Sequence, residues 1–371
     1  MENSKTSTYI WPAEWHPQYC IQLTWPHEGT DWRECLDEIT ETFIQLISII
    51  ATYEKAVIVT PDITGTGKLL KTRITKAEMQ KNIYLFQCPT NDTWNRDHGG
   101  IVLTGNRDGG TQKASCRFLD FKFNGWGEKF TAAHDNAINR QLYSTKWLAA
   151  TYEDHNDFVL EGGSIESDGK GTVFTTSQCL LAPHRNQPLG REDIEQELKR
   201  RLHAQRIVWL DHGNLVGDDT DGHIDTIVRT APDDTLIYIR CDNPDDEQYE
   251  DFTALEKQLE QLKTCEGKPY KLLALPMPDA ILHEGERLPA TYANFLIIND
   301  AVICPTYDQE EKDNMAMATL RSAFAGRKVI GLDSRTIIRQ HGSIHCLTMQ
   351  FPVEATPQES SIEGIVCLAE T

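Results

Sequence analysis

The stretch RIVWLDHGNLVGDDTDGHIDTIVRTAPDDTLIYIR at residues 206–240 contains an arrangement that recurs along the chain. An apolar segment at 206–213 ends in a turn, a loop of small and polar residues lies at 221–226, and a second apolar segment follows at 235–240. Beyond it, residues 249–263 have apolar side chains at three- and four-residue spacing, with charges between them. Short apolar runs bounded by turn residues predict strands, and this spacing predicts a helix. The stretch therefore predicts a strand–loop–strand unit followed by a helix.

The same order of elements is predicted along most of the chain. Helical spacing occurs in five segments, at 33–50, 132–149, 191–204, 249–263 and 309–324. Strands are predicted after four of these helices, at 55–62, 206–213, 271–279 and 328–335. Further strands are predicted before the helices, at 20–29, 118–123, 172–177, 235–240 and 301–306. The units also share a loop position, at 96–101, 161–166, 221–226, 292–297 and 341–346.

Five such units predict a single α/β domain over residues 1–371 with rough fivefold pseudosymmetry. The last loop would have to pair with the first strand, at 20–29, which would close the units into a ring. Helices would then lie outside, and the loops would converge on the axis. A doubly wound α/β sheet is the alternative. It explains the alternation of strands and helices, but it does not explain why the loop before the final strand keeps the same character, rich in glycine and polar residues.

Composition limits the classes of function. The chain has 36 basic and 56 acidic residues, a formal net charge of -20, which disfavours nucleic-acid binding. An acidic cleft would concentrate a cationic small molecule, although an acidic surface also serves solubility and leaves a homo-oligomer open. No apolar run is long enough to span a membrane, and the N-terminus has no signal-peptide pattern, so we expect a cytoplasmic protein. The ten cysteines include no CxxC pair, which argues against a disulfide scaffold or a zinc site.

The polar residues of the loops predict a site if the loops converge. The candidates are Trp94, Asp97, Glu161, His223, Asp225 and Cys346. A cysteine thiolate is a strong nucleophile, and a histidine can move protons near neutral pH. Clustered carboxylates repel one another unless a cation lies among them, and a planar guanidinium matches them well. A second histidine at ligand spacing is absent from the sequence, so a cationic substrate is favoured over a metal.

Each candidate alone also has an ordinary explanation. Cys346 lies in an apolar stretch that predicts a strand, where a free cysteine usually belongs to the core. Asp97 beside Arg96 could form a surface ion pair. His223 and Asp225 would point to the same side of a strand, because they are two residues apart. The joint placement of the candidates at equivalent positions of repeated units favours a site. For His98, His341 and His345, we expect structural or secondary roles.

Six ordered blocks carry a resemblance to a known family. They are WPAEWHPQ at 11–18, LTWPHEGTDW at 23–32, NDTWNRDHGG at 91–100, LEGGSIESDGKGT at 160–172, TDGHIDT at 220–226 and GSIHCLTMQ at 342–350. Together they resemble the agmatine deiminase family, which is grouped with bacterial-type peptidylarginine deiminases in the guanidine-modifying superfamily. The resemblance runs from about Trp11 to Pro352. It implies the pentein fold, an α/β-propeller of five ββαβ units.

The resemblance also implies a role for each candidate residue. Cys346 would be the nucleophile and His223 the general acid and base. Asp97 and Asp225 would hold the guanidinium, Glu161 would contact it or orient His223, and Trp94 would line the channel. No metal or organic cofactor is expected. The implied reaction is hydrolysis of agmatine to N-carbamoylputrescine and ammonia through a thiouronium intermediate, a step of putrescine and polyamine biosynthesis.

The sequence departs from the family's pattern in three places, which concern the channel more than the chemistry. The family commonly has RDTGP, GGGNIHC and CITQQ where this chain has RDHGG, QHGSIHC and CLTMQ. The alternatives are therefore a deiminase of arginine, of peptidyl-arginine or of another guanidine. A cysteine protease is a more distant alternative and leaves the three carboxylates unexplained. A non-catalytic binder of a cationic metabolite is another, and it would have no use for Cys346.

Overall fold

A repeated three-stranded arrangement organises the computed structural model, which describes residues 9–105, 115–358 and 362–371. Across these residues, five sheets pair two strands antiparallel and add a third strand parallel to the second. The antiparallel pairs are β5 (Ile101–Gly105) with β6 (Cys116–Lys122), β8 (Ile165–Ser167) with β9 (Thr172–Thr176), β11 (Val228–Ala231) with β12 (Thr235–Arg240), β16 (Leu296–Ile298) with β17 (Ala301–Thr306), and β19 (Thr348–Pro352) with β2 (Gln18–Thr24). The chain is therefore an α/β protein with mixed sheets, as the sequence predicts.

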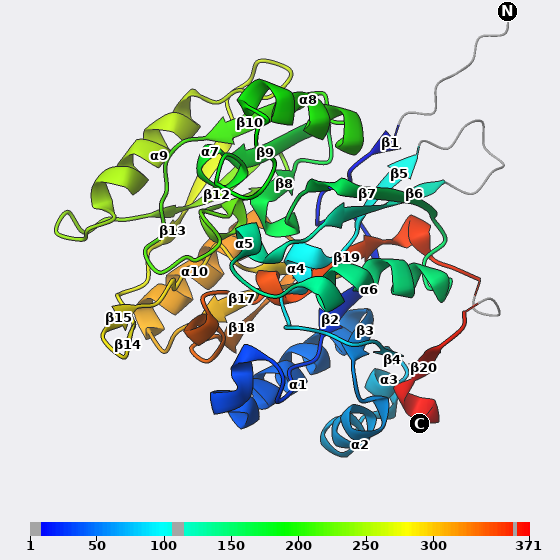
Figure 1. The fold of residues 1–371 in the computed structure, drawn as a ribbon. Helices are drawn as coiled ribbons and strands as arrows, with labels where there is room; N and C mark the ends of the chain where they lie inside the picture. Colours follow the sequence, from blue (N-terminus) through cyan, green and yellow to red (C-terminus); the bar gives the residue numbers. More distant parts are fainter. Residues whose placement is uncertain (1–8, 106–114, 359–361) are drawn as a thin grey trace, which may run out of the picture.

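A helix precedes the third strand of each sheet. The helix–strand pairs are α6 (Ala133–Ser144) with β7 (Thr151–Val159), α8 (Arg191–Leu202) with β10 (Arg206–Leu210), α9 (Tyr249–Gln261) with β13 (Lys271–Pro276), α10 (Glu310–Ala323) with β18 (Lys328–Asp333), and α1 (Leu36–Tyr53) with β3 (Lys55–Thr60). Figure 1 shows α1, α8 and α9 at the outer margin of the molecule, with α4 (Asn95–His98) and β19 near its middle.

The ends of the chain add further strands and helices to two sheets. β1 (Tyr9–Ile10) pairs with β5, and β4 (Ile83–Gln87) with β20 (Ile365–Cys367) extends the sheet of β2 and β3. The remaining short elements are α2 (Ile63–Arg73), α3 (Ala77–Gln80), α5 (Gly125–Glu128), α7 (Ser177–Leu180), the hairpin β14 (Leu282–His283) with β15 (Glu286–Arg287), and the 3₁₀ turns η1 (Asp31–Cys35), η2 (Gly162–Ser164), η3 (Ile224–Thr226), η4 (Ile337–Gln340), η5 (His345–Leu347), η6 (Val353–Ala355) and η8 (Leu368–Glu370). Neither α2 nor the hairpin has the apolar periodicity that predicts an element.

Pairing between the two ends of the chain confirms the prediction that the last loop joins the first strand. β19 runs antiparallel to β2, with Thr348 opposite Leu23 and Phe351 opposite Cys20. All seven residues of β2 are buried, because this strand has a neighbour on each side and helix α1 packs over it. Cys346 comes just before β19, so this pairing fixes where the loop at 341–346 lies.

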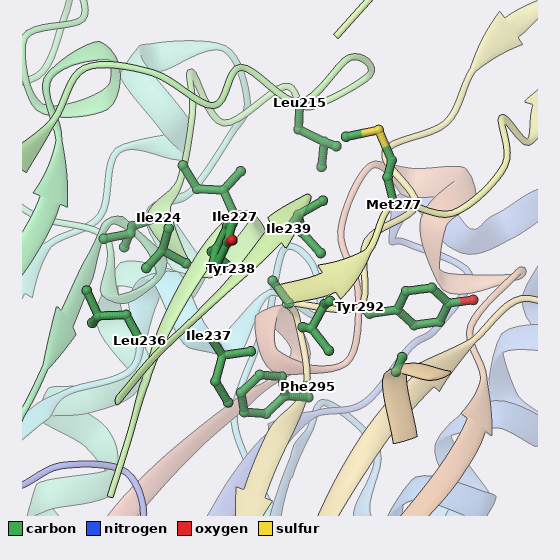
Figure 2. Packing of buried hydrophobic residues seen from close by; sticks show 14 of the residues in the cluster. Leu215, Ile224, Ile227, Leu236, Ile237, Tyr238, Ile239, Met277, Tyr292 and Phe295 are labelled. Carbon is green, nitrogen blue, oxygen red and sulfur yellow. The ribbon is translucent and has the colours of Figure 1, made fainter. Parts of the chain in front are cut away.

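The cores pack directly behind the loops. The largest cluster joins the sheet of β11, β12 and β13 to residues of the next unit, such as Tyr292 and Phe295 (Figure 2). Ile224 is fully buried in this cluster. Because the apolar side chain points into the core, its two neighbours His223 and Asp225 are available to the opposite side.

Several predicted boundaries differ from the observed ones. The predicted helix at 132–149 ends at Ser144, where the Thr145 hydroxyl donates to Leu142 O and Lys146 takes a positive φ of 60°. The strand β7 has no counterpart in the prediction, because its sequence TYEDHNDFV is polar and partly exposed. No helix among the described segments has the length and apolarity needed to cross a bilayer. Residues 1–8, which carry much of the signal-peptide argument, lie outside the described part.

The pairing of β19 with β2 gives a stability prediction. Phe351 is fully buried and packs edge-to-face on Phe118 at a centroid distance of 6.0 Å. We expect Phe351→Ala to lower the free energy of unfolding by about 3–5 kcal/mol, since it removes a large core side chain. Val353→Ala is the matched control, because Val353 is 44 % exposed and should change stability by less than about 0.5 kcal/mol. Urea denaturation of both variants measures the difference; equal losses would contradict this packing.

Candidate active site

The structure brings together the candidate residues, which come from four of the five predicted loops. Asp97 lies in α4, Glu161 precedes η2, His223 precedes η3, and Cys346 lies in η5. His223 Nδ1 is 3.6 Å from Asp97 Oδ1, and its Nε2 is 3.8 Å from Glu161 Oε2. Cys346 Sγ is 3.9 Å from Oδ2 of Asp225, the second residue of η3. All five side chains are buried.

Close backbone approach explains the two glycines that follow Glu161. Gly163 N donates to Asp97 Oδ1 at 3.0 Å. A Cβ atom on Gly163 would lie 2.6 Å from His223 Nδ1 and 2.8 Å from Asp97 Oδ1. A glycine is therefore required here for the loops of Asp97, Glu161 and His223 to meet.

The charges around His223 favour its protonated form. Burial opposes a charge on the imidazole, but Asp97, Cys179 and Glu161 face it and raise the pKa of His223 well above its ordinary value. Burial raises the pKa of Asp97 to about 6, with His223 opposing the shift and Asp225 and Glu161 adding to it. His223 lies between the carboxylates of Asp97 and Glu161 and is therefore placed to act as an acid.

Arg185 gives Glu161 a buried counter-ion. Its Nε donates to both Glu161 oxygens at 3.2 Å, and its Nη1 donates to Asp221 Oδ2 at 2.7 Å. Burial opposes the charge of Glu161, but His223 and Arg185 outweigh it and lower the pKa of Glu161. Because Arg185 Nη2 also donates to Thr220 O at 2.8 Å, this one side chain ties the Glu161 loop to the His223 loop.

Cys346 is a thiol in a negative environment. Its Sγ contacts Asn294 Oδ1 at 3.4 Å, and the same oxygen accepts from the backbone N–H groups of Cys346 and His345. Burial raises the pKa of Cys346 well above its ordinary value, and the charges of Asp225 and Asp97 add to the shift. A cation that neutralised these two carboxylates would favour the thiolate.

A cavity of about 620 Å³ opens onto the thiol. Its lining includes Trp94, Asp97, Phe123, Trp126, Phe130 and Cys346, together with Lys129 and four further aspartates. Trp126 Nε1 donates to Asp97 Oδ2 at 2.9 Å, so one aromatic wall also orients a carboxylate. Gly342 lies against Trp94, where a Cβ atom would come within 2.1 Å of the indole ring.

Glu161, Cys179 and His223 have the geometry of a possible metal site, since their ligand atoms lie within 4.8 Å of one another. Glu161 already accepts from Arg185 through both oxygens. Burial raises the pKa of the Cys179 thiol, and His223 favours its charged form. A metal ion would therefore have to displace two protons beside a fixed guanidinium, and the set fits proton transfer better than metal binding.

Two predictions about local structure are wrong. Cys346 lies in the 3₁₀ turn η5 and not in a strand, because the regular pairing with β2 begins only at Thr348. His223 and Asp225 lie at a 3₁₀ turn, and they converge because Ile224 between them is buried in the core. Asp97 and Arg96 do not form a surface ion pair, since both are buried.

Four contributing residues escaped the sequence-based prediction. Asn294 lies in the loop at 292–297, which has no charged residue to draw attention to it. Arg185, Trp126 and Glu14 reach the site from segments outside the repeated loops. A signal existed for Glu14 only, which lies within the block WPAEWHPQ.

Comparisons with known proteins agree over nearly the whole chain. Residues 10–352 match the family model described as Porphyromonas-type peptidyl-arginine deiminase. A Porphyromonas gingivalis crystal structure named "Putative Arginine Deiminase" is 44% identical, with a TM-score of 0.85 over 94% of this chain and 99% of that chain. A cysteine-to-serine variant of C. jejuni agmatine deiminase with substrate bound is 34% identical, with a TM-score of 0.84 over 94% and 97%. A Marinomonas sp. (strain MWYL1) protein named "Putative agmatine deiminase" is 33% identical over 92% of this chain and 94% of its own.

The protonation of His223 can be measured directly. We expect the imidazole resonances of His223, assigned by comparison with His223→Gln, to remain those of an imidazolium at pH 7, because the pKa of His223 is raised well above its ordinary value. Asp97→Asn removes a facing charge and should make the ring lose its proton at lower pH. His98 is an internal reference, since burial lowers its pKa to about 3 and it should be neutral in both proteins. A neutral His223 at pH 7 would contradict the electrostatic description.

Proposed function

The chain belongs to the Porphyromonas-type peptidyl-arginine deiminase family, and on that premise we propose that it hydrolyses agmatine to N-carbamoylputrescine and ammonia. It is a hydrolase that acts on the C–N bond of a guanidinium group. The observation that carries the proposal is the placement of the Cys346 thiol and the His223 imidazole among the carboxylates of Asp97, Glu161 and Asp225. Three carboxylates suit a cation, and the thiol and imidazole supply a nucleophile and an acid.

In the proposed first step, the substrate itself activates the nucleophile. The guanidinium binds between Asp97 and Asp225, whose Oδ1 is buried and has no hydrogen-bond partner among the described residues. Neutralising these carboxylates removes two charges that raise the pKa of Cys346, so the thiol loses its proton through the cavity to solvent. The Cys346 thiolate therefore forms only when the guanidinium is bound next to it.

The proposed chemistry then divides into two transfers. The Cys346 thiolate adds to the guanidinium carbon, and one C–N π pair moves to nitrogen. His223 gives its proton to an NH₂ group, which leaves as ammonia with its bonding pair and leaves a thiouronium cation on Cys346. Neutral His223 next takes a proton from water as the oxygen attacks the carbon. The C–S bond breaks, the hydroxyl proton returns to the thiolate, and the ureido product is released.

The charged residues of the cavity wall support agmatine over arginine. Asp31, Asp92, Asp135 and Asp219 line the wall. Lys129 is the lysine among the lining residues, and its ammonium is already bonded to Asp221 Oδ1 at 2.9 Å and to Asp219 O at 2.6 Å. Burial raises the pKa of Asp92 to about 6 and that of Asp135 to about 7, and a bound ammonium favours the ionised form of both, so this wall suits the amine of agmatine better than the carboxylate of free arginine.

The proposed architecture extends what the five sheets have in common. We infer that the sheets are the five ββαβ units of a pentein α/β-propeller around the loops of the site, which β19 completes by pairing with β2. The shared strand pattern supports this inference. A single catalytic domain, a cytoplasmic location, a homo-oligomeric state and a role in putrescine biosynthesis stay predictions.

A substrate panel tests the proposed function. Purified protein is given agmatine, arginine and a blocked arginyl peptide, and the ureido product is measured colorimetrically. We expect kcat/KM for agmatine to exceed that for arginine by about a hundredfold or more, because an unpaired carboxylate is rejected by an acidic wall. Cys346→Ala should lower turnover by about 10³-fold or more with an unchanged circular-dichroism spectrum.

The outcomes of this panel separate the substrate, the reaction and the role of Cys346. Preference for arginine or the peptide would overturn agmatine as the substrate but leave the proposed deimination in place. Arginine is included because the 44% identical Porphyromonas gingivalis protein is named a putative arginine deiminase. Absence of ureido product from all three compounds would overturn the function itself. Substantial turnover by Cys346→Ala would remove Cys346 from the mechanism.

The titration of Asp97 predicts the acid limb of the pH profile. Burial raises the pKa of Asp97 to about 6, so this carboxylate is ionised above that pH and protonated below it. We expect kcat/KM for agmatine to fall as the pH drops through about 6. Trp126→Phe removes the indole donor that lowers the Asp97 pKa, and should move the limb to higher pH by about one unit. Phe130→Leu alters the same wall without touching Asp97 and should leave the limb in place; a limb that moves equally in both variants would refute the assignment.

A further inference from the structure

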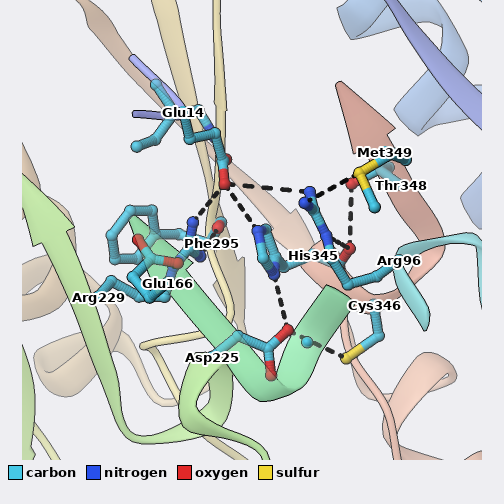
Figure 3. A network of polar contacts seen from close by, with 12 residues as sticks. Glu14, Arg96, Glu166, Asp225, Arg229, Phe295, His345, Cys346, Thr348 and Met349 are labelled. Atoms are coloured by element: carbon cyan, nitrogen blue, oxygen red, sulfur yellow. Dashed lines mark hydrogen bonds and ion pairs between the residues drawn. The ribbon is translucent and has the colours of Figure 1, made fainter. Parts of the chain in front are cut away.

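We propose that His345 is a positioning residue for the deimination, which acts through Asp225 and is itself held by Glu14. Figure 3 shows the imidazole between these two carboxylates, with Cys346 on the far side of Asp225. His345 Nδ1 lies 2.7 Å from Asp225 Oδ2, and Nε2 lies 2.7 Å from Glu14 Oε2. The inference rests on the proposed function, in which Asp225 holds the substrate guanidinium.

Two short contacts from one imidazole impose a proton count. A neutral imidazole has one N–H, so it can donate to one carboxylate only. The other ring nitrogen also lies 2.7 Å from a carboxyl oxygen, and this contact is a hydrogen bond only if a second proton is present, either on the nitrogen or on the oxygen. Glu14, His345 and Asp225 therefore share two protons as one chain, which we call the Glu14–His345–Asp225 chain.

The far end of this chain is anchored. Glu14 Oε2 accepts from Arg229 Nη2 at 2.6 Å, and Glu14 Oε1 accepts from Ile297 N at 2.7 Å. Arg229 also donates to Phe295 O at 2.6 Å and lies over the Phe295 ring. Arg96 approaches the same carboxylate at 3.9 Å. Glu14 is thus fixed by backbone and buried cations, so it can hold an imidazole in one orientation.

The near end of the chain sets how Asp225 faces the site. Oδ2 is occupied by His345 and also faces Cys346 Sγ at 3.9 Å, whereas Oδ1 has no partner in the described part of the chain. A carboxylate turns easily about its Cβ–Cγ bond unless a hydrogen bond holds it. The His345 contact therefore leaves Oδ1 free for the guanidinium and keeps Oδ2 beside the sulfur.

His345 does not act as a second general acid or base. Both of its nitrogens are engaged, and only 1 % of its side chain is exposed. The groups that face it are Asp225 and Glu14 in contact, Arg229 bonded to Glu14, and Arg96, whose Nε donates to His345 O at 3.4 Å. Burial, with the charges of these two arginines, lowers the pKa of His345 well below its ordinary value. The ring is therefore a fixed link, and His223 remains the imidazole that meets the reacting atoms.

A matched pair of substitutions separates the two contacts. The amide nitrogen of asparagine is as many bonds from Cα as Nδ1 of histidine, and that of glutamine is as many as Nε2. His345→Asn therefore keeps a donor toward Asp225, and His345→Gln keeps a donor toward Glu14. We expect His345→Gln to raise KM for agmatine at least tenfold and His345→Asn to raise it less than about fivefold, since only the Asp225 contact faces the substrate.

A readout without turnover checks the same point. The charge of Asp225 raises the pKa of Cys346, so an Asp225 that turns away should let the thiolate form at lower pH. Alkylation of Cys346 by iodoacetamide, followed across pH by residue-resolved mass spectrometry, should begin at lower pH in His345→Gln than in His345→Asn. This measurement stands even if no guanidine is a substrate. Failure of the proposed function would show as absent turnover in the natural protein, and failure of the inference as identical alkylation profiles.

Substitutions of His98 control for the general effect of removing a buried histidine. His98 is also buried, and its ring nitrogens have no hydrogen-bond partner among the residues described. His98→Asn and His98→Gln should lower the melting temperature without any order between them in KM or in alkylation of Cys346. Equal KM values and equal alkylation profiles for His345→Asn and His345→Gln would overturn the proposal.

A second variant covers the case in which His345→Gln does not fold. Glu14→Gln keeps the size of the side chain but weakens the contact that holds Nε2 of His345, so the ring should be fixed less firmly toward Asp225 and KM should rise severalfold. Glu166→Gln is its control, because Glu166 Oε2 accepts from Arg229 Nε at 3.2 Å as part of the same cluster. KM should not change in Glu166→Gln. A rise of equal size in both variants would show that only the charge of Arg229 matters, and would overturn the role of the chain.

Discussion

The bond between the Arg185 guanidinium and both oxygens of Glu161 holds the site together. Removing such charges from water is unfavourable by several kcal/mol for each ion, so a buried carboxylate persists only with a partner. Arg185 donates to Glu161, to Asp221 and to Thr220 O, and so fixes the loop of Glu161 against the loop of His223. His223 then occupies the space left between Glu161 and Asp97. Each loop is fixed by the charges of another, so the pKa of His223 depends on the positions of all of them.

The same constraint bears on the proposed nucleophile. Asp97 and Asp225 face Cys346, and their charges add to burial in raising the pKa of its thiol. His223 favours its own proton and cannot act as the base for the thiol. In the proposed mechanism, an incoming cation neutralises the two carboxylates, which lets the Cys346 thiolate form, and protonated His223 then serves as the acid. A neutral molecule would meet a thiol, and an anion would meet two carboxylates, so the electrostatics select the charge of the ligand before its shape matters.

The sequence predicted the parts of the molecule that follow from local patterns and from their repetition along the chain. Alternating strands and helices, the repeated loop position and the pairing of the last strand with the first follow from apolar runs and their order, and β19 pairs with β2 as expected. The clustering of Asp97, Glu161, His223 and Cys346 follows from the repeat. The missed parts depend on long-range contacts. Glu14 meets His345 across 331 positions, and β7 is a strand because β6 pairs with it, although its sequence is polar.

Local conformation was harder to predict than proximity, and this difference bears on specificity. Cys346 lies in the 3₁₀ turn η5, and the segment that leads to it starts at His341, a left-handed residue with φ of 64° that ends η4. His341 Nδ1 contacts Gly217 O at 2.7 Å, so the turn is tied to the loop that carries Asp219. The family's usual glycine-rich turn would lack this side chain. The buried charges proposed to hold the guanidinium are therefore separate from the wall that includes His341 and Asp219. On that proposal, we expect changes in this wall to alter the accepted substrate without disturbing the chemistry at Cys346.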